Sequence, residues 1–268
     1  MKIRNFRLIK FSQYDIKNGT KIPSLENELL AYETGVHLGD GSMQIIKGGT
    51  HSVRYYGDPK EDWIFVSEIL PEIVKHLYNK KVIARKYPDK CCLSVCSKAV
   101  TTFKHNVLGL PIGNKLQLKG LPKFVKQNKT LLVNCLRGIA DTDFGLYFQS
   151  NGSPTLICAM NNKELIKDIS IELKNLGLSV KTKFDIKRIR KGKENTEHVL
   201  KLYGRKNLEI WMKIIGFWNP KHLTKYLAWK YLNFSKNRTT INQRILMLKK
   251  AGISFDPKRR PRRSKKGP

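Results

Sequence analysis

The spacing of hydrophobic and polar positions changes twice from a helical period to a strand period, in the same order each time. Apolar residues at helical spacing lead up to Asp40, and short runs that alternate apolar and polar residues follow it. The same change occurs at Asp143. We therefore predict a mixed α/β chain of the α+β type, with two similar units that each run helix, two strands, helix, two strands, helix.

The length of the repeat supports this division. Asp40 lies 69 residues before Gly109, where the first unit closes, and Asp143 lies 73 residues before Gly216 in the second. One hairpin loop can absorb the difference. The predicted boundaries are 1–111 for the first unit, 112–129 for a lysine-rich linker, 130–234 for the second unit, and 235–268 for a basic C-terminal extension and tail.

Small residues recur at every fourth position of the first helix in each unit. They are Ala31, Gly35 and Gly39 in one helix, and Asn134, Gly138 and Thr142 in the other. Such a row lets another helix backbone approach closely. Each helix then ends on an aspartate, at the unfavourable end of the helix dipole, which favours a cation partner. Helices packed along these rows would bring Asp40 and Asp143 side by side.

These two helices resemble the nine-residue motif of the LAGLIDADG homing endonucleases, in the single-chain form with two motif copies. The copies are Glu33–Gly41 and Leu136–Phe144, so the acid of the eighth position falls on Asp40 and Asp143. Departures from the motif are Glu33, Leu38 and Phe144, at its first, sixth and ninth positions. The resemblance implies a monomer of two pseudo-symmetric αββαββα units whose eight antiparallel strands form a saddle over double-stranded DNA.

The resemblance also implies an intron-encoded nuclease that cuts both strands of one long asymmetric site, leaving 3′ overhangs, by metal-dependent hydrolysis. Asp40 and Asp143, with the backbone carbonyls of Gly39 and Thr142, would hold the cations. Hard oxygen ligands suit Mg²⁺ or Mn²⁺, which can activate water and stabilise the leaving oxygen. The alternative is a protein of the same fold that binds nucleic acid without cleavage, such as an intron RNA maturase or a regulator.

The charge of the chain agrees with a polyanionic partner. Fifty-two Lys and Arg against 21 Asp and Glu leave a net charge of +31, which favours nucleic acid first and an anionic membrane surface second. We see no apolar run of the ~20 residues that span a bilayer and no signal-peptide core. We therefore expect no membrane partner, and a place in a prokaryotic cytoplasm or an organellar matrix. The five cysteines lack C-x-x-C spacing, which favours reduced thiols over a zinc site.

Residue parity in the predicted strands separates an apolar face from a basic face. Val180, Phe184 and Ile186 fall on one side of their strand, and lysines fall on the other. A sheet with a basic face suits the major groove, where cations meet phosphates and side chains read base edges. Single lysines there are equally consistent with simple solvation. The predicted DNA-binding residues are Gln44, Arg54, Arg85, Tyr147, Gln149, Lys181, Lys183, Lys187 and Lys201.

Two basic residues occupy matching places in the units. Lys98 precedes Gly109 by eleven residues, and Arg205 precedes Gly216 by the same number. These places resemble those where the family carries a basic residue beside the active site, so we expect both residues to be catalytic. They would stabilise charge on the scissile phosphate or assist the activation of water. Because arginine keeps its proton, Arg205 also fits a simple phosphate clamp.

Overall fold

The computed structural model describes residues 6–46, 48–190, 192–234 and 236–257. The last part of the predicted basic tail, 258–268, lies outside these residues. Over the described part of the chain, no helix has the length and hydropathy needed to cross a membrane.

The first unit has the predicted order of elements around one antiparallel sheet with strand order β1-β2-β4-β3. Two short helices, η1 (Phe6–Leu8) and α1 (Gln13–Lys17), precede it. Its elements are α2 (Glu28–Asp40), β1 (Gly41–Ile46), β2 (Thr50–Gly57), the π-helical turn η2 (Phe65–Ile69), α3 (Leu70–Tyr78), β3 (Arg85–Lys86), β4 (Cys91–Cys96) and α4 (Lys98–Asn106). Pro71 lies at the start of α3, directly after the π-helical turn, where proline is tolerated although it lacks the N–H of a helix interior.

The second unit repeats this arrangement, with strand order β5-β6-β8-β7, and so confirms the predicted fold class. Its elements are α6 (Lys129–Asp143), β5 (Phe144–Phe148), β6 (Pro154–Met160), α7 (Lys163–Asn175), β7 (Lys181–Arg190), β8 (Lys193–Tyr203) and α8 (Gly204–Ile214). Between the units lie η3 (Lys115–Gln117) and α5 (Lys123–Lys126), and α9 (Pro220–Leu232) and α10 (Ile241–Lys250) follow the second unit.

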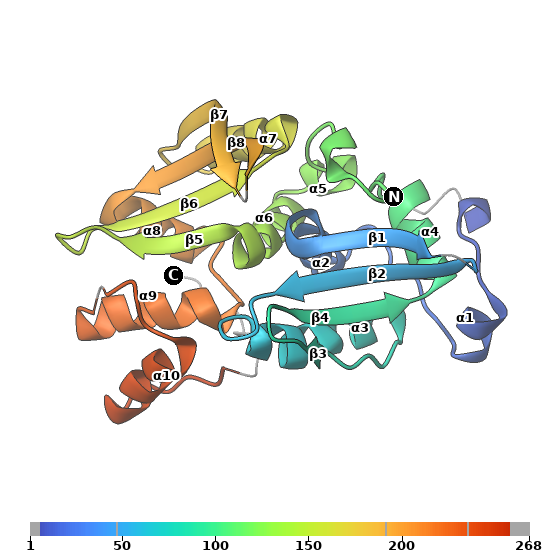
Figure 1. Cartoon of the computed structure of the whole chain (residues 1–268), viewed down its shortest axis with the longest axis horizontal. Coiled ribbons are helices and arrows are strands. Elements are labelled where there is room, and N and C mark those ends of the chain that lie inside the picture. The colour runs from blue at the N-terminus through green and yellow to red at the C-terminus, as the bar shows by residue number, and fades with distance from the viewer. Residues whose placement is uncertain (1–5, 47, 191, 235, 258–268) are drawn as a thin grey trace.

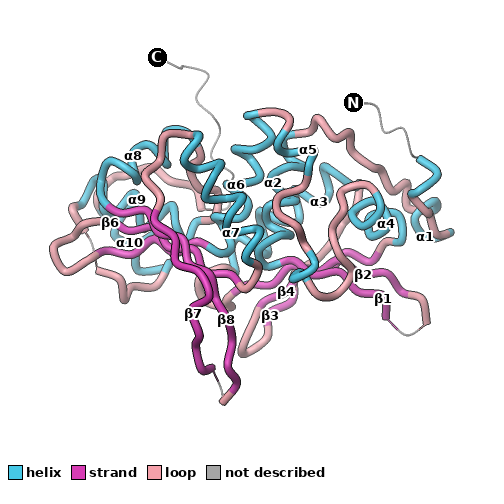
Figure 2. The backbone as a smooth tube through the Cα atoms, turned by 90° about the horizontal axis from the view of Figure 1, so that it is seen from above, coloured by secondary structure: helices cyan, strands magenta, loops and turns pink. Residues whose placement is uncertain are grey.

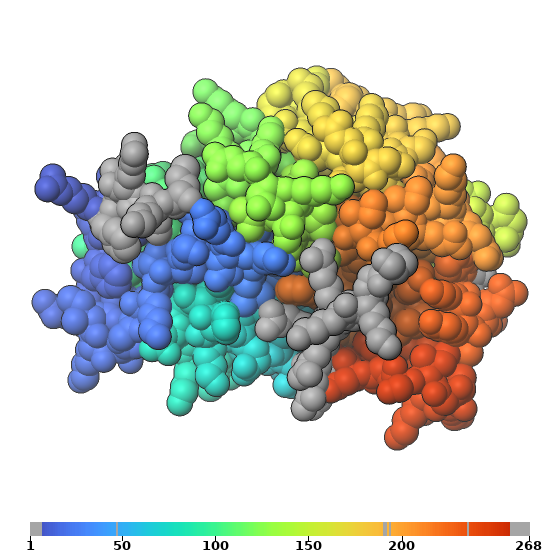
Figure 3. All heavy atoms as spheres, turned by 180° about the vertical axis from the view of Figure 1, so that it is seen from behind, coloured from blue at the N-terminus to red at the C-terminus, as the bar shows by residue number. Residues whose placement is uncertain are grey.

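The strands of both sheets lie on one side of the molecule and most helices lie on the other (Figure 2). Figure 1 shows the two sheets side by side, with α9 next to β5 and α10 next to α9. From behind, the green segment that includes the linker separates the blue first unit from the yellow and orange second unit (Figure 3). Apolar strand residues such as Val53, Leu93, Leu156 and Leu200 are buried against the helices. The exposed and half-buried strand residues, such as Arg54 and Lys201, lie on the other face of each sheet.

Two local details shape the ends of these elements. The motif helices are capped by Asn27 and Asn128, because each asparagine side chain accepts hydrogen bonds from the first turn of its helix. Strands β7 and β8 form a long hairpin. Ion pairs across this hairpin join Lys187 to Glu194 at 3.1 Å and Arg188 to Glu197 at 3.0 Å.

Candidate active site at the ends of two crossing helices

Helices α2 and α6 touch through their glycines. A Cβ atom added to Gly35 would lie 2.0 Å from the carbonyl oxygen of Cys135, and one added to Gly138 would lie 2.1 Å from that of Tyr32. Neither separation is tolerable for a real side chain, so both backbones need glycine at the crossing. The predicted packing along rows of small residues is thus confirmed.

The C-terminal ends of the same helices meet at the aspartates. A Cβ atom on Gly39 would lie 1.9 Å from Oδ2 of Asp143 and 2.0 Å from Oγ1 of Thr142. The carboxyl group of Asp143 therefore reaches the residue directly before Asp40. As the sequence predicts, the two acids share one place between the units.

Both carboxyl groups have raised pKa values. Burial and the negative charge of Asp143 raise the pKa of Asp40 to about 8, and burial raises the pKa of Asp143. Two partly buried carboxylates this close repel each other when both are ionised. Positive charge near these carboxyl groups would therefore stabilise their ionised forms.

A lysine that the sequence reading missed supplies part of that charge. Lys115, in the linker, donates hydrogen bonds from Nζ to the carbonyl oxygen of Leu38 at 2.9 Å and to that of Gly39. Burial lowers the pKa of Lys115, although the charges of Asp143 and Asp40 oppose this shift. Its ammonium group thus lies at the end of α2, beside the two aspartates.

Lys221 is a second lysine near the acids that the sequence reading missed. Nζ of Lys221, at the start of α9, lies 3.2 Å from Oδ2 of Asp62. Its positive charge also stabilises the ionised forms of Asp40 and Asp143. Lys115 and Lys221 therefore flank the pair of acids, one from each segment that follows a unit.

A sequence signal for these lysines exists. Lys115 lies six residues after Gly109, and Lys221 lies five residues after Gly216. The two lysines therefore lie at nearly matching distances after Gly109 and Gly216, the glycines at which the two units end.

The substitutions in the motif have local explanations. A Cβ atom on Gly41 would lie 2.5 Å from Cα and 2.6 Å from the carbonyl oxygen of His37, so the backbone of the first copy leaves no room for a side chain in its ninth position. The ninth position of the second copy is Phe144. Phe144 is 3% exposed there, and its ring lies 5.1 Å from that of Trp211. Phe144 is therefore a core residue that leaves Asp143 in place.

Glu33, the departure at the first motif position, is fully buried beneath the first sheet. Its carboxylate accepts hydrogen bonds from Nζ of Lys104 at 2.7 Å and from the hydroxyl of Tyr78 at 3.0 Å, and a further one from the hydroxyl of Tyr55. A buried charge with these partners is satisfied, so Glu33 serves the core.

The donor set suits a hard divalent cation. Two carboxylates come together at the helix ends, and the charge repulsion that raises the pKa of Asp40 would be relieved by a cation. Within the described residues no cluster of three or more His, Cys, Asp or Glu offers a competing metal site, and all five cysteines are free thiols.

In the part of the chain that the structure describes, neither Lys98 nor Arg205 forms a hydrogen bond or an ion pair with Asp40 or Asp143, and neither charge shifts the pKa of these acids. The backbone N–H of Lys98 donates to Oδ2 of Asp15 at the start of α4. The guanidinium of Arg205 lies 4.9 Å from the centre of the Trp229 ring, in a hollow between α8 and α9. They do hold matching places, because each lies at the start of the last helix of its unit.

The predicted DNA-binding residues of the first sheet lie on its exposed face. Gln44 and Arg54 are half-buried and lie on the neighbouring strands β1 and β2. In this pair of strands Ser42 is opposite Arg54, and Gln44 is opposite Ser52. Arg54 and Arg85 line one open hollow of about 810 Å³ over this sheet. The hollow has the basic lining that suits a phosphate backbone.

The predicted residues of the second sheet are also accessible. Tyr147 and Gln149 are exposed, as are Lys181, Lys183 and Lys187, whereas Lys201 is half-buried. Lys181 lies 5.7 Å from the ring centre of Tyr203, and Lys225 lies 5.5 Å from that of Tyr147. Cations that contact aromatic rings make a surface suited to bases and phosphates together.

Comparison with known proteins identifies the fold. No family model and no curated protein matches the sequence. Among solved structures, I-DmoI in complex with DNA and Mn matches with a TM-score of 0.51 and 19% identity, over 70% of this chain and 96% of that chain. A variant of I-DmoI with its target DNA in the presence of Mg matches with a TM-score of 0.50 and 19% identity, over 70% and 95%. I-WcaI, bound to its DNA recognition sequence, gives 0.46 and 14%, over 76% and 87%.

Proposed function

We propose, from the LAGLIDADG homing-endonuclease fold that this chain shares with I-DmoI, that the protein is a site-specific DNA endonuclease. It makes a staggered double-strand break in one long asymmetric site by metal-dependent hydrolysis, and it acts as a monomer because both units lie in one chain. The observation that carries the proposal is the meeting of Asp40 and Asp143 at the ends of two helices that cross through glycine.

Each residue at the centre has a role in this proposal. Asp40 and Asp143, with the carbonyls of Gly39 and Thr142, hold Mg²⁺ or Mn²⁺. The bound cation supplies activation of water and stabilisation of the leaving oxygen. Lys115 and Lys221 place ammonium groups beside the acids, where they stabilise the negative charge that builds on the scissile phosphate. Lys98 and Arg205 serve as phosphate contacts away from the reacting atoms.

The basic face of the two sheets binds duplex DNA. Because the chain carries a net charge of +31, its affinity for DNA falls steeply as the salt concentration rises. The residues of the two faces differ, so the two halves of the site differ in sequence. The contacts come from Gln44, Arg54, Arg85, Tyr147, Gln149, Lys181, Lys183, Lys187 and Lys201.

Selection from a library of randomised duplexes, with and without Mg²⁺, tests the proposal. We expect one long sequence to be bound in both conditions and cut with 3′ overhangs only when Mg²⁺ is present, with Asp143→Asn as the binding-competent control. Specific binding without cleavage would favour the maturase or regulator of the same fold, and preference for structured intron RNA would identify a maturase. Absence of nucleic-acid binding would refute both.

A further inference from the structure

The two segments that carry the flanking lysines are each held by the opposite unit. The segment with Lys115 follows the first unit, and Asn162 of the second unit holds it. Nδ2 of Asn162 donates to the carbonyl oxygens of Lys115 at 3.0 Å and Leu118 at 2.9 Å. These hydrogen bonds involve only the backbone of the segment. The ammonium group of Lys115 instead contacts the end of α2.

The segment with Lys221 follows the second unit, and Asp62 of the first unit holds it. Oδ2 of Asp62 lies 3.2 Å from Nζ of Lys221, and Oδ1 accepts a hydrogen bond from Nδ2 of Asn219 at 2.8 Å. The same Nδ2 donates to the carbonyl oxygen of Asp141 at 2.8 Å. Asp62 thus forms an ion pair with the ammonium group of Lys221. Through Asn219 it is also linked by hydrogen bonds to the last turn of α6.

Asp62 is itself rigidly placed. Its side chain is 8% exposed, and Oδ2 accepts a hydrogen bond from the backbone N–H of Asp58 at 3.0 Å. Burial lowers the pKa of Lys221, but the charge and hydrogen bond of Asp62 outweigh it and raise that pKa. Lys221 therefore stays a cation in a fixed place.

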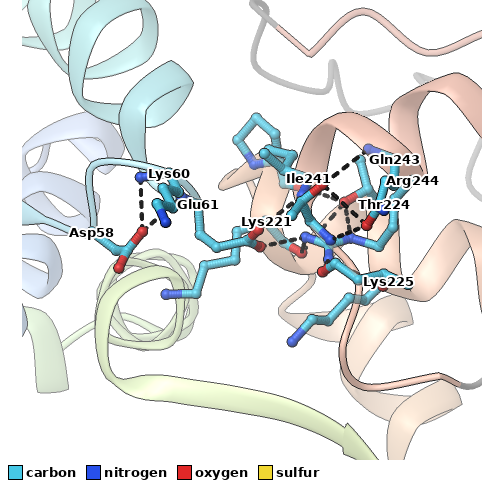
Figure 4. Close-up of polar contacts among 12 residues, drawn as sticks. Asp58, Lys60, Glu61, Lys221, Thr224, Lys225, Ile241, Gln243 and Arg244 are labelled. Atoms are coloured by element: carbon cyan, nitrogen blue, oxygen red, sulfur yellow. Dashed lines mark hydrogen bonds and ion pairs between the residues drawn. The ribbon is translucent and has the colours of Figure 1, made fainter.

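The neighbouring acid, Glu61, fixes the helices that carry Lys221. Oε2 of Glu61 accepts a hydrogen bond from Arg244 at 2.6 Å, and Oε1 accepts one from the backbone N–H of Ile241 at 2.8 Å, at the start of α10. Arg244 is 1% exposed and donates from Nε to the hydroxyl of Thr224 on α9 at 3.0 Å. Figure 4 shows Glu61 facing Arg244 from the other unit, with Lys221 beside them.

We propose that Asp62 is a positioning residue that holds the ammonium of Lys221 beside the Asp40–Asp143 centre, and that the Glu61–Arg244 pair fixes the helices behind it. This inference rests on the proposed function only for its effect on cleavage. The extension formed by α9 and α10 is then part of the active-site assembly. The two lysines are unequal, because a carboxylate of the opposite unit anchors Lys221 and only a neutral amide holds the segment of Lys115.

Amine reactivity tests the anchoring without DNA or metal. The full chain is acetylated briefly, and the modification of each lysine is followed by mass spectrometry. Asp62→Asn removes the negative charge that is paired with the ammonium group of Lys221. We therefore expect the acetylation rate of Lys221 to rise by roughly tenfold, and that of Lys115 to rise by less than about twofold. Asp62→Glu should restore much of the protection.

Matched variants separate anchoring from general loosening. Glu164→Gln removes the exposed partner of Lys167 on α7 and should leave Lys221 unchanged. Glu61→Gln keeps the shape of the side chain and should raise the reactivity of Lys221 by less than Asp62→Asn does. Unchanged Lys221 in folded Asp62→Asn, or an equal rise at Lys115 and Lys221, would overturn the proposal.

Strand-specific single-turnover cleavage then measures the consequence. We expect Asp62→Asn to slow one strand at least fivefold more than the other, with unchanged affinity for DNA and partial rescue by Asp62→Glu. Equal slowing of both strands would contradict the unequal roles of the lysines. If the wild-type chain cuts no duplex, the proposed function fails while the reactivity result still decides whether Asp62 anchors Lys221.

Discussion

The C-terminal ends of α2 and α6 have the same backbone arrangement, because each helix ends on an aspartate and leads directly into a strand. The side chains around the two ends differ. Lys115 contacts backbone carbonyls at the end of α2, whereas Lys221, whose charge also acts on both acids, is paired with the carboxylate of Asp62. The first copy needs Gly41 beside His37, and the second accommodates Phe144. The duplicated fold determines where the acids meet, and residues that differ between the units determine how each acid is surrounded.

The largest expected effect comes from the residues that the two ends share. Asp40→Asn and Asp143→Asn should each reduce cleavage of both strands by at least ~1000-fold, about 4 kcal/mol of barrier, if one centre serves both. Binding should be intact or tighter, because a repulsion between carboxylate and phosphate is removed. Single-turnover cleavage and a DNA-binding titration measure the two quantities. Loss of only one strand in each variant would indicate two separate centres.

The next effect tests the crossing itself. Gly35→Ala places a methyl group 2.0 Å from a backbone carbonyl of α6, so the helices must separate, at a cost of about 3 kcal/mol in the free energy of unfolding. Gly145→Ala is the matched control. The three atoms nearest to its Cβ would all belong to the side chain of Tyr147, which is exposed and can swing away, so we expect a loss of less than about 1 kcal/mol. Urea unfolding compares them, and equal losses would contradict the close crossing.

A smaller effect separates the basic residues. Lys115→Met should slow cleavage at least tenfold, about 1.4 kcal/mol of barrier, because its ammonium lies beside the acids. Lys98→Met should change the rate by less than about threefold, since a lost phosphate contact acts mainly on binding. Single-turnover rates at saturating enzyme distinguish the two. The opposite order would restore the catalytic role expected of Lys98 from the sequence.

The sequence predicts those features that depend on local spacing. Rows of small residues and the change of period at Asp40 and Asp143 are local, and they were enough to predict the crossing helices, the two sheets and the shared acids. The path of a connecting segment across the molecule is not local. Lys115 and Lys221 therefore went unrecognised, while Lys98 and Arg205, chosen by equal spacing, hold matching places away from the acids.

The partners of buried charged groups could not be predicted from the sequence either. Glu33 replaces an apolar motif residue, and only the structure shows that Tyr55, Tyr78 and Lys104 surround it. The sequence likewise gave no reason to connect Asp62 with Lys221, which lie in different units. Such pairs form only when the units pack together.

The central claim, that Asp40 and Asp143 form one anionic centre, is tested most directly by a double-mutant cycle in unfolding free energy at pH 4 and pH 8. The raised pKa of Asp40, about 8, means that the folded chain binds its proton more tightly than the unfolded chain. Stability is therefore lost as the pH rises from about 4 to 8. Asp40→Asn removes this loss, so the variant should match wild type at pH 4 and exceed it at pH 8.

In the Asp143→Asn background the gain at pH 8 should be smaller by at least about 1 kcal/mol, because the repulsion between the carboxylates is already gone. Equal gains in the two backgrounds would show that the carboxyl groups do not interact, and the account of one shared centre would be wrong.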